Sequence, residues 1–307
     1  MYQVCQFRSP KMLPGGKVTV NNWKLLSIEK NITFSILFTI GTSLIFCYLH
    51  YSDFSIFSET LSMIITMIAY LCKLTNFISQ SGTLVELERI LDNPIFTSVS
   101  KDEEIILKHH TRSLRIITNI YRTLCILTVV FYFTNSFIDS DRQNGLKLPL
   151  PAWFPFETRD HYYKVYFLQL VTMIVAVWFN LAMDLLLVKL LALGEAEFEV
   201  LKHRLRNITS RDEDEKIGFD HLVEKRLRKC IFHHEHNLRF VALTENVFSL
   251  GVLVQFMCSV LVTCLNGFYI LVISLKSVQF VQRIVYSSCM LCQIATYCWY
   301  GQVLADS

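Results

Sequence analysis

The sequence predicts an all-α protein, a polytopic bundle of membrane helices. Apolar residues make up 52% of its 307 residues and charged residues only 18%, whereas an ordinary soluble chain is about a quarter charged. The charged residues also leave six long apolar stretches between them. Finally, Lys and Arg are concentrated in alternate connections between those stretches, which is typical of a chain that crosses a membrane repeatedly.

A helix needs about 20 mostly apolar residues to cross the hydrocarbon core of a bilayer. The first stretch, 31–52, contains no charged residue. The second, 60–82, is interrupted only by Lys73, and the third, 116–138, only by Arg122. We expect both of these long side chains near helix ends, where they can reach the headgroups. The remaining predicted helices are 165–193, 246–275 and 284–305.

The distribution of basic residues orients these helices. Segment 1–30, the connection 83–115 and the loop 194–245 together carry twenty Lys and Arg residues, and the other three connections carry six. Because Lys and Arg are retained on the cytoplasmic side, we predict a cytoplasmic N-terminal segment 1–30 and a cytoplasmic loop 194–245. Six spans then bring the C-terminus back to the cytoplasm.

Composition and motifs exclude several classes of function. A net charge of +3 without a basic block does not favour nucleic acid, and no nucleotide, protease or hydrolase motif is present. We therefore predict neither an enzyme nor a cofactor. His233, His234 and His236 lack the Cys and carboxylate partners of a closed metal site, so we expect a histidine-bearing cytoplasmic helix face. Cys289 and Cys292 have CxxC spacing inside an apolar span, which favours helix packing.

Two acids lie within or beside the predicted helices. Asp184 is in the fourth helix and Glu245 is at the start of the fifth. An acid inside a membrane can handle ions, but both lie toward the cytoplasmic ends, where bridging or capping is the simpler interpretation. All six prolines lie outside the predicted helices. A transporter, which commonly uses broken helices, is therefore disfavoured.

The connection between the third and fourth predicted helices is rich in proline and aromatic residues. Pro149, Pro151 and Pro155 preclude a helix and favour a stiff, extended path. Trp153, Phe154 and Phe156 alternate with these prolines. They fit either an aromatic belt at the membrane interface or a lid over a ligand cavity, and the sequence leaves both interpretations open.

The outer halves of the second, third and fourth predicted helices are rich in Phe, Tyr and Met. Contact with lipid explains most such residues, but a cavity between the helices would suit a small, mostly apolar molecule. The residues predicted to bind it are Met63, Met67, Tyr132, Phe133, Tyr166 and Met173.

Several segments together resemble the insect odorant receptor family. The loop 148–156 looks like the second extracellular loop of that family. The stretch 233–240, followed by 245–249 and by Gln255-Phe256, is similar to its run into helix 5. The ending 297–302 looks like its helix 6 exit. The order and spacing of these segments fit the predicted cytoplasmic N-terminus.

This resemblance implies a subunit of a ligand-gated cation channel with seven helices in the plasma membrane of sensory neurons. Such a subunit binds a small volatile odorant among helices 2, 3, 4 and 6 and forms a hetero-tetramer with a co-receptor. Helix 7 lines the pore, and the loop between helices 4 and 5 belongs to the cytoplasmic assembly region. Only six of the expected seven helices are found here, so we expect residues 1–307 to insert in the bilayer without conducting ions.

Two other receptor classes are alternatives to this one. A gustatory receptor would share the fold and the topology, but the proline-rich loop favours the odorant branch. A G-protein-coupled receptor needs an extracellular N-terminus, which the distribution of basic residues opposes.

Overall fold

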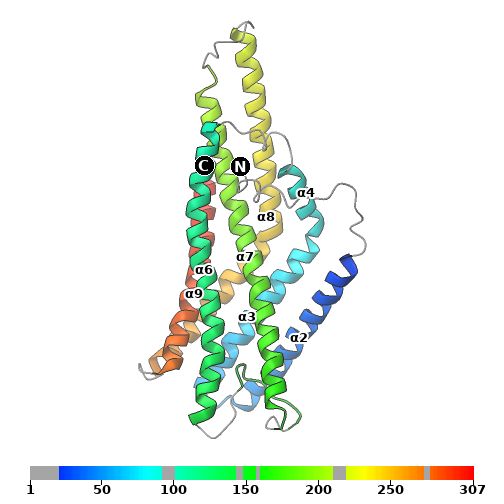
Figure 1. The fold of residues 1–307 in the computed structure, drawn as a ribbon, viewed down its shortest axis with the longest axis vertical. Helices are drawn as coiled ribbons and strands as arrows, with labels where there is room; N and C mark the ends of the chain where they lie inside the picture. The colour runs from blue at the N-terminus through cyan, green and yellow to red at the C-terminus, as the bar shows by residue number, and fades with distance from the viewer. Residues whose placement is uncertain (1–20, 92–100, 143–147, 157–159, 210–218, 273–276) are drawn as a thin grey trace.

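The computed structural model describes residues 21–91, 101–142, 148–156, 160–209, 219–272 and 277–307. Within them the regular structure is helical and includes no strand, which confirms the predicted all-α class. Successive long helices run in opposite directions along the long axis of the molecule (Figure 1). The helices are α2 (Asn21–Leu49), α3 (Phe54–Ser79), α4 (Ser81–Leu91), α6 (Lys101–Arg142), α7 (Tyr162–Arg206), α8 (Phe219–Val272) and α9 (Val278–Asp306).

Three helices extend well beyond the predicted spans. α6, α7 and α8 contain 42, 45 and 54 residues, more than twice the roughly 20 that a bilayer requires. The prediction of a loop over 194–245 was therefore wrong as secondary structure, because α7 continues to Arg206 and α8 begins at Phe219. Charged residues such as Glu, Lys and Arg end a membrane span, but they are good helix formers. An apolar cluster of Leu107, Ala196 and Val200 also joins the extensions of α6 and α7.

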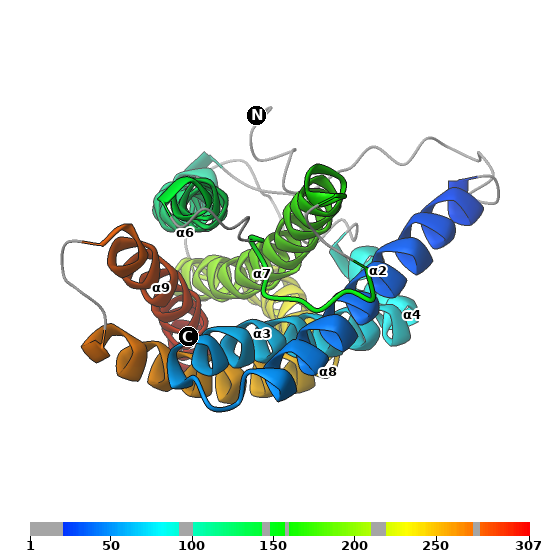
Figure 2. The same ribbon diagram turned by 90° about the horizontal axis from the view of Figure 1, so that it is seen from below.

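The helices pack as one bundle. α3 packs along α8, α6 packs against α7 and α9, and α7 also contacts α8 and α9. α2 lies against α3 and α7. Figure 2 shows α6 and α9 on one side of the bundle, α2 and α4 on the other, and α7 running between them. The loop 148–156 crosses this end of the bundle from α7 toward α2.

Four helices are long and apolar enough to cross a membrane: Ile56–Ser79, Glu103–Ser136, Tyr162–Arg206 and Val223–Leu271. The described apolar part of α2, Thr33–Leu49, is shorter. α9 is not among the four. Its buried side is polar, which lowers its average hydropathy, and includes Gln282, Arg283, Gln293 and Thr296. The count of six spans remains a prediction, and it is favoured by the packing of α2 and α9 against the four apolar helices.

The bundle exposes apolar side chains and buries polar ones. Phe34, Trp178 and Leu253 are exposed on the outside of α2, α7 and α8, while Asp184 and Arg283 are almost fully buried. A protein in water avoids large exposed apolar patches. A surface of this kind is instead favourable in contact with lipid.

Candidate functional site

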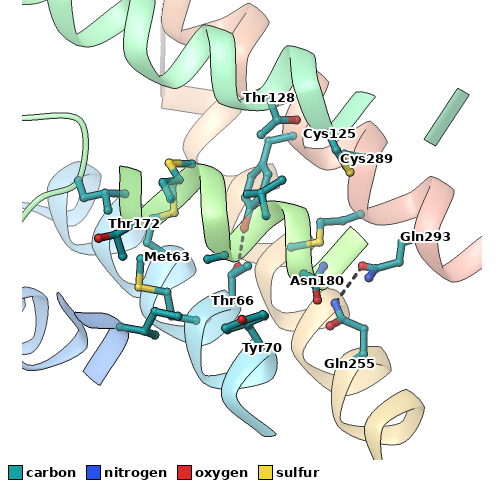
Figure 3. Close-up of a pocket in the computed structure, with 18 of the residues that line it drawn as sticks. Met63, Thr66, Tyr70, Cys125, Thr128, Thr172, Asn180, Gln255, Cys289 and Gln293 are labelled. Atoms are coloured by element: carbon teal, nitrogen blue, oxygen red, sulfur yellow. Dashed lines mark hydrogen bonds between the residues drawn. The ribbon is translucent and has the colours of Figure 1, made fainter. Parts of the chain in front are cut away.

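A cavity of about 130 Å³ lies between the helices, and α2, α3, α6, α7, α8 and α9 all contribute to its wall (Figure 3). A cavity of about 150 Å³ accommodates benzene, so this one matches a small organic molecule. Most of its wall is apolar, as a site for such a ligand usually is. The apolar lining residues include Ile36, Met63, Met67, Leu150, Met173, Ala176, Val177 and Met290.

The structure brings together the six residues predicted to bind a ligand, in two layers. Met63, Met67 and Met173 line the cavity. The remaining three lie behind the cavity wall in one apolar cluster with Met63 and Met173; they are Tyr132, Phe133 and Tyr166.

The aromatic residues behind the wall are held in fixed orientations. Tyr132 packs edge-on against Tyr286, a lining residue, with 6.0 Å between ring centroids. Phe133 packs edge-on against Tyr166 at 5.6 Å, and the Tyr166 hydroxyl donates to the carbonyl oxygen of Phe133 over 3.3 Å. Tyr132 thus contacts the cavity wall at Tyr286, while Phe133 and Tyr166 pack against each other in the same apolar cluster.

The loop 148–156 is not helical, as its prolines predict, and it contributes Leu150 to the cavity wall. The backbone N–H of Leu150 donates to Oε1 of Gln169, and Nε2 of Gln169 donates to the carbonyl oxygen of Leu150, each over 3.1 Å. Leu150 is only 1% exposed. One side chain of α7 thus holds both backbone groups of the residue that covers the cavity.

The three aromatic residues proposed as a lid lie outside the cavity lining. The backbone N–H of Trp153 donates to the carbonyl oxygen of Thr42 over 3.0 Å. Phe154 packs near Phe38 of α2, with 6.3 Å between ring centroids. Trp153 and Phe156 remain exposed. Their position flanks the cover that Leu150 provides and also suits an interfacial belt.

The inner end of the cavity is polar, because Tyr121, Asn180, Gln255 and Gln293 line it. Three of these residues donate to Asp184, which lies behind the lining. Oδ1 of Asp184 accepts from Lys73 Nζ and from the Tyr297 hydroxyl, each over 2.6 Å. Oδ2 accepts from the Tyr121 hydroxyl over 2.6 Å, from Gln293 Nε2 over 2.5 Å and from Asn180 Nδ2 over 3.2 Å. The bridging role expected for Asp184 is what the geometry shows.

The expectation that Lys73 reaches the headgroups was wrong. Its side chain is 8% exposed and forms a salt bridge with Asp184. It also donates to Asn180 Oδ1 over 3.0 Å. A buried ammonium needs a partner because burial without one is costly. The acid on α7 supplies that partner, so Lys73 turns inward.

A second buried ion pair lies toward the opposite end of α9. The sequence places Arg283 in the outer connection, but it belongs to α9 and is 1% exposed. Its guanidinium lies 2.6 Å from Glu59 Oε1 and donates to Asn266 Oδ1 over 3.2 Å. It also stacks over the Tyr269 ring at 4.5 Å. A count of charges by segment could not reveal this ion pair, because the pair forms only when both side chains point into the bundle.

The other polar residues noted in the sequence have ordinary surroundings. His233 lies on a helix, α8, as expected, and its side chain is fully buried, with Nε2 3.4 Å from Glu197 Oε2. His234 and Glu245 are exposed. Arg122 is exposed and donates to Asn119 over 2.9 Å. Among the described residues no group of three His, Cys, Asp or Glu side chains could hold a metal ion.

Comparison with known proteins identifies the family. The family model described as 7tm Odorant receptor matches residues 53–307. Odorant receptor 46a, isoform A, of Drosophila melanogaster is 24% identical over 258 residues, which are 81% of this chain and 64% of that protein. The chain therefore spans a little under two thirds of the length of this relative.

Solved structures of olfactory receptor OR5 from Machilis hrabei have the same fold. The complex with eugenol superposes with a TM-score of 0.80 at 13% identity, covering 97% of this chain and 78% of OR5. A second structure of OR5 superposes with a TM-score of 0.79 at 14% identity, covering 99% of this chain and 80% of OR5. The fold is thus that of an insect olfactory receptor, and because the family model covers most of its length, the chain belongs to the odorant receptor family.

Proposed function

We propose that this chain is an odorant receptor subunit that binds small, mostly apolar volatile molecules in the cavity between its helices. We further propose that it sits in the plasma membrane and gates a cation channel within a hetero-tetramer that includes a co-receptor. The observation that carries the proposal is the cavity of about 130 Å³, apolar along most of its wall and polar at one end. Membership of a receptor family, not an enzyme family, agrees with it.

Two further observations support ligand binding in this cavity. Methionines from three helices, Met63, Met173 and Met290, form much of the wall, and their flexible side chains can adapt to ligands of different shape. The related OR5 was solved in complex with eugenol, which is also a small organic molecule.

Binding can be tested with the chain in lipid nanodiscs, using displacement of an apolar fluorescent probe by volatile compounds. Ala176 lines the cavity, whereas Ile174 on the same helix is exposed on the outside of the bundle. Ala176→Phe fills the cavity and should abolish displacement. Ile174→Phe adds an aromatic ring to the same helix and should leave displacement unchanged. Equal effects of the two variants would reject the cavity as the binding site.

Gating needs a separate measurement. The chain and the co-receptor are expressed together, and odorant-evoked current is compared with that of the co-receptor alone. An additional current that Ala176→Phe removes supports the gating proposal. Ligand binding without such a current would restrict the role of this chain to binding.

A further inference from the structure

We infer that the inner end of the cavity selects ligands that carry a hydroxyl group, because Asp184 forces Gln255 to present a hydrogen-bond acceptor to the ligand. The inference rests on the proposed function and specifies the chemical class of the ligand. It follows from a chain of hydrogen bonds in which each amide has only one possible orientation.

The first step is set by the Asp184 carboxylate. An ionised carboxylate only accepts hydrogen bonds, whereas a side-chain amide has a donating NH₂ end and an accepting oxygen. Gln293 Nε2 lies 2.5 Å from Asp184 Oδ2 and 3.4 Å from the Tyr297 hydroxyl. Both hydrogens of this NH₂ group are thus used, and Gln293 must turn its oxygen the other way.

The second step passes this orientation to α8. Gln293 Oε1 lies 2.9 Å from Gln255 Nε2, and because the former can only accept, Gln255 must donate. The second hydrogen of Gln255 Nε2 goes to Ser259 Oγ, also over 2.9 Å. Ser259 directs its own proton to the sulfur of Met290 at 4.0 Å, so its oxygen is available to accept.

Gln255 Oε1 is then left over. Gln255 is 4% exposed and lines the cavity, and its Oε1 atom has no hydrogen-bond partner among the residues that the structure describes. Figure 3 shows Gln255 and Gln293 joined at this end of the cavity, with Asn180 beside them. A ligand that fills this end of the cavity buries the oxygen, which costs free energy unless the ligand donates a hydrogen bond to it.

Most other polar groups of the lining have already used their protons. Thr66 donates to the carbonyl oxygen of Ser62 over 2.8 Å, so the Tyr286 hydroxyl, 2.5 Å away, donates to Thr66. Thr128 donates to the carbonyl oxygen of Leu124 over 2.8 Å. These hydroxyl groups can still accept a hydrogen bond, but they have no proton to offer a ligand.

Asn180 completes the inner end. Its oxygen accepts from Lys73 and one hydrogen of its NH₂ group goes to Asp184, which leaves the second hydrogen. An alcohol or phenol hydroxyl can donate to Gln255 and accept from Asn180 at the same time. An ether or an aldehyde of the same size can only accept, so it leaves Gln255 Oε1 unsatisfied.

Benzyl alcohol and anisole provide the test, because they are isomers and only the alcohol donates a hydrogen bond. Their affinities are measured by probe displacement on the wild-type chain in nanodiscs and on Gln255→Met, which keeps the side-chain length and removes the amide. One net hydrogen bond is worth about five- to tenfold in affinity. Gln255→Met should lower the affinity for benzyl alcohol by about that factor and change the affinity for anisole by less than about twofold.

Two further variants sharpen the result. Thr128→Val removes one of the other acceptors in the lining and should preserve the difference in affinity between the two ligands. Asp184→Asn places an NH₂ group where the carboxylate stood, which reverses the amide orientations through Gln293 to Gln255. This variant should remove or invert the preference for the alcohol. If Asp184→Asn does not fold, Gln255→Met alone decides.

The outcomes separate this inference from the proposed function. Equal effects of Gln255→Met on both ligands, or loss of the alcohol preference in Thr128→Val instead, would overturn the assignment of Gln255 while ligand binding stands. Failure of both compounds, and of other volatiles, to displace the probe from the wild-type chain would reject the binding function itself.

Discussion

Lys73 of α3 and Asp184 of α7 form a salt bridge 2.6 Å long in which the two side chains are only 8% and 2% exposed. The two partners are not equally dependent on it. Asp184 keeps four other hydrogen-bond donors without Lys73, namely Tyr121, Asn180, Gln293 and Tyr297. Lys73 without Asp184 keeps, within the described part of the chain, only the side-chain oxygen of Asn180 as a partner.

Asp184→Leu should therefore destabilise the fold more than Lys73→Met. Removing one partner of a buried ion pair costs about 3–5 kcal/mol, and we expect Asp184→Leu at the upper end of that range and Lys73→Met at the lower. The measurement is the midpoint of thermal unfolding in detergent, monitored by size-exclusion chromatography. Arg122→Met, on an exposed side chain, serves as the control and should shift stability by less than about 0.5 kcal/mol. The reverse order of the two buried variants would contradict this account of the network.

Arg283→Lys should also lower the unfolding midpoint, although it keeps the charge. The guanidinium contacts Glu59, Asn266 and the Tyr269 ring simultaneously. A Lys ammonium is a single point of charge on a differently shaped side chain and cannot reproduce this arrangement. Arg122→Lys is the matched control for the same substitution on an exposed site. Equal midpoints for the two variants would show that Arg283 contributes only its charge.

Gly194 should tolerate substitution less well than Gly41. A Cβ atom at Gly194 would lie 3.1 Å from Leu304 Cδ1 and 3.5 Å from Phe240 Cε1, whereas one at Gly41 would meet nothing within 4 Å. Overpacking costs about 1–3 kcal/mol, so Gly194→Val should lower the unfolding midpoint. Gly41→Ala should leave it unchanged or raise it, because Ala is a better helix former by about 1 kcal/mol. A stable Gly194→Val would mean that the end of α9 moves aside freely.

Tyr132→Ala and Met173→Ala should affect ligand binding differently. Met173 lines the cavity, so its truncation changes which compounds fit. Tyr132 packs against Tyr286 from behind the cavity wall, so its truncation should lower the affinity for compounds of every shape by a similar factor. Probe displacement with linear and aromatic compounds measures both effects. A selective change in Tyr132→Ala would instead place that side chain in direct contact with ligand.

The orientation in the membrane can be tested with epitope tags. The excess of Lys and Arg in segment 1–30 and in 194–245 predicts that both face the cytoplasm. A tag at residue 1 should be stained only after permeabilisation, whereas a tag inserted at 157–159 should be stained on intact cells. Staining of the N-terminal tag on intact cells would contradict the predicted topology.

The sequence was sufficient to predict the six long helices, because apolar stretches between charged residues are a property of the chain itself. The short helix α4, whose residues were assigned mostly to the connection 83–115, was not predicted. The sequence was also not sufficient to predict where the long helices end. The residues of 194–245 that leave the membrane region are also good helix formers, so α7 and α8 continue through them.

The polar end of the cavity was harder to predict than its apolar wall. Met63, Met67 and Met173 could be predicted as lining residues because apolar side chains in the outer halves of neighbouring helices contact either lipid or each other. Gln255 and Gln293 carry no charge and therefore do not stand out within an apolar span. Their importance comes from a contact between α8 and α9, and such contacts depend on helix rotations that one sequence does not specify.

The attachment of Leu150 to Gln169 makes the backbone anchorage of the loop independent of the side chain that the loop places against the cavity. Gln169 binds only the backbone of Leu150, in the way that a neighbouring strand would bind it. These two backbone hydrogen bonds therefore do not depend on which side chain residue 150 carries. Replacement of Leu150 by a smaller or larger apolar residue would change the height of the cavity and leave its cover in place. Under the proposed function, a single substitution at position 150 would therefore change the size of the ligand that fits, without rebuilding the loop.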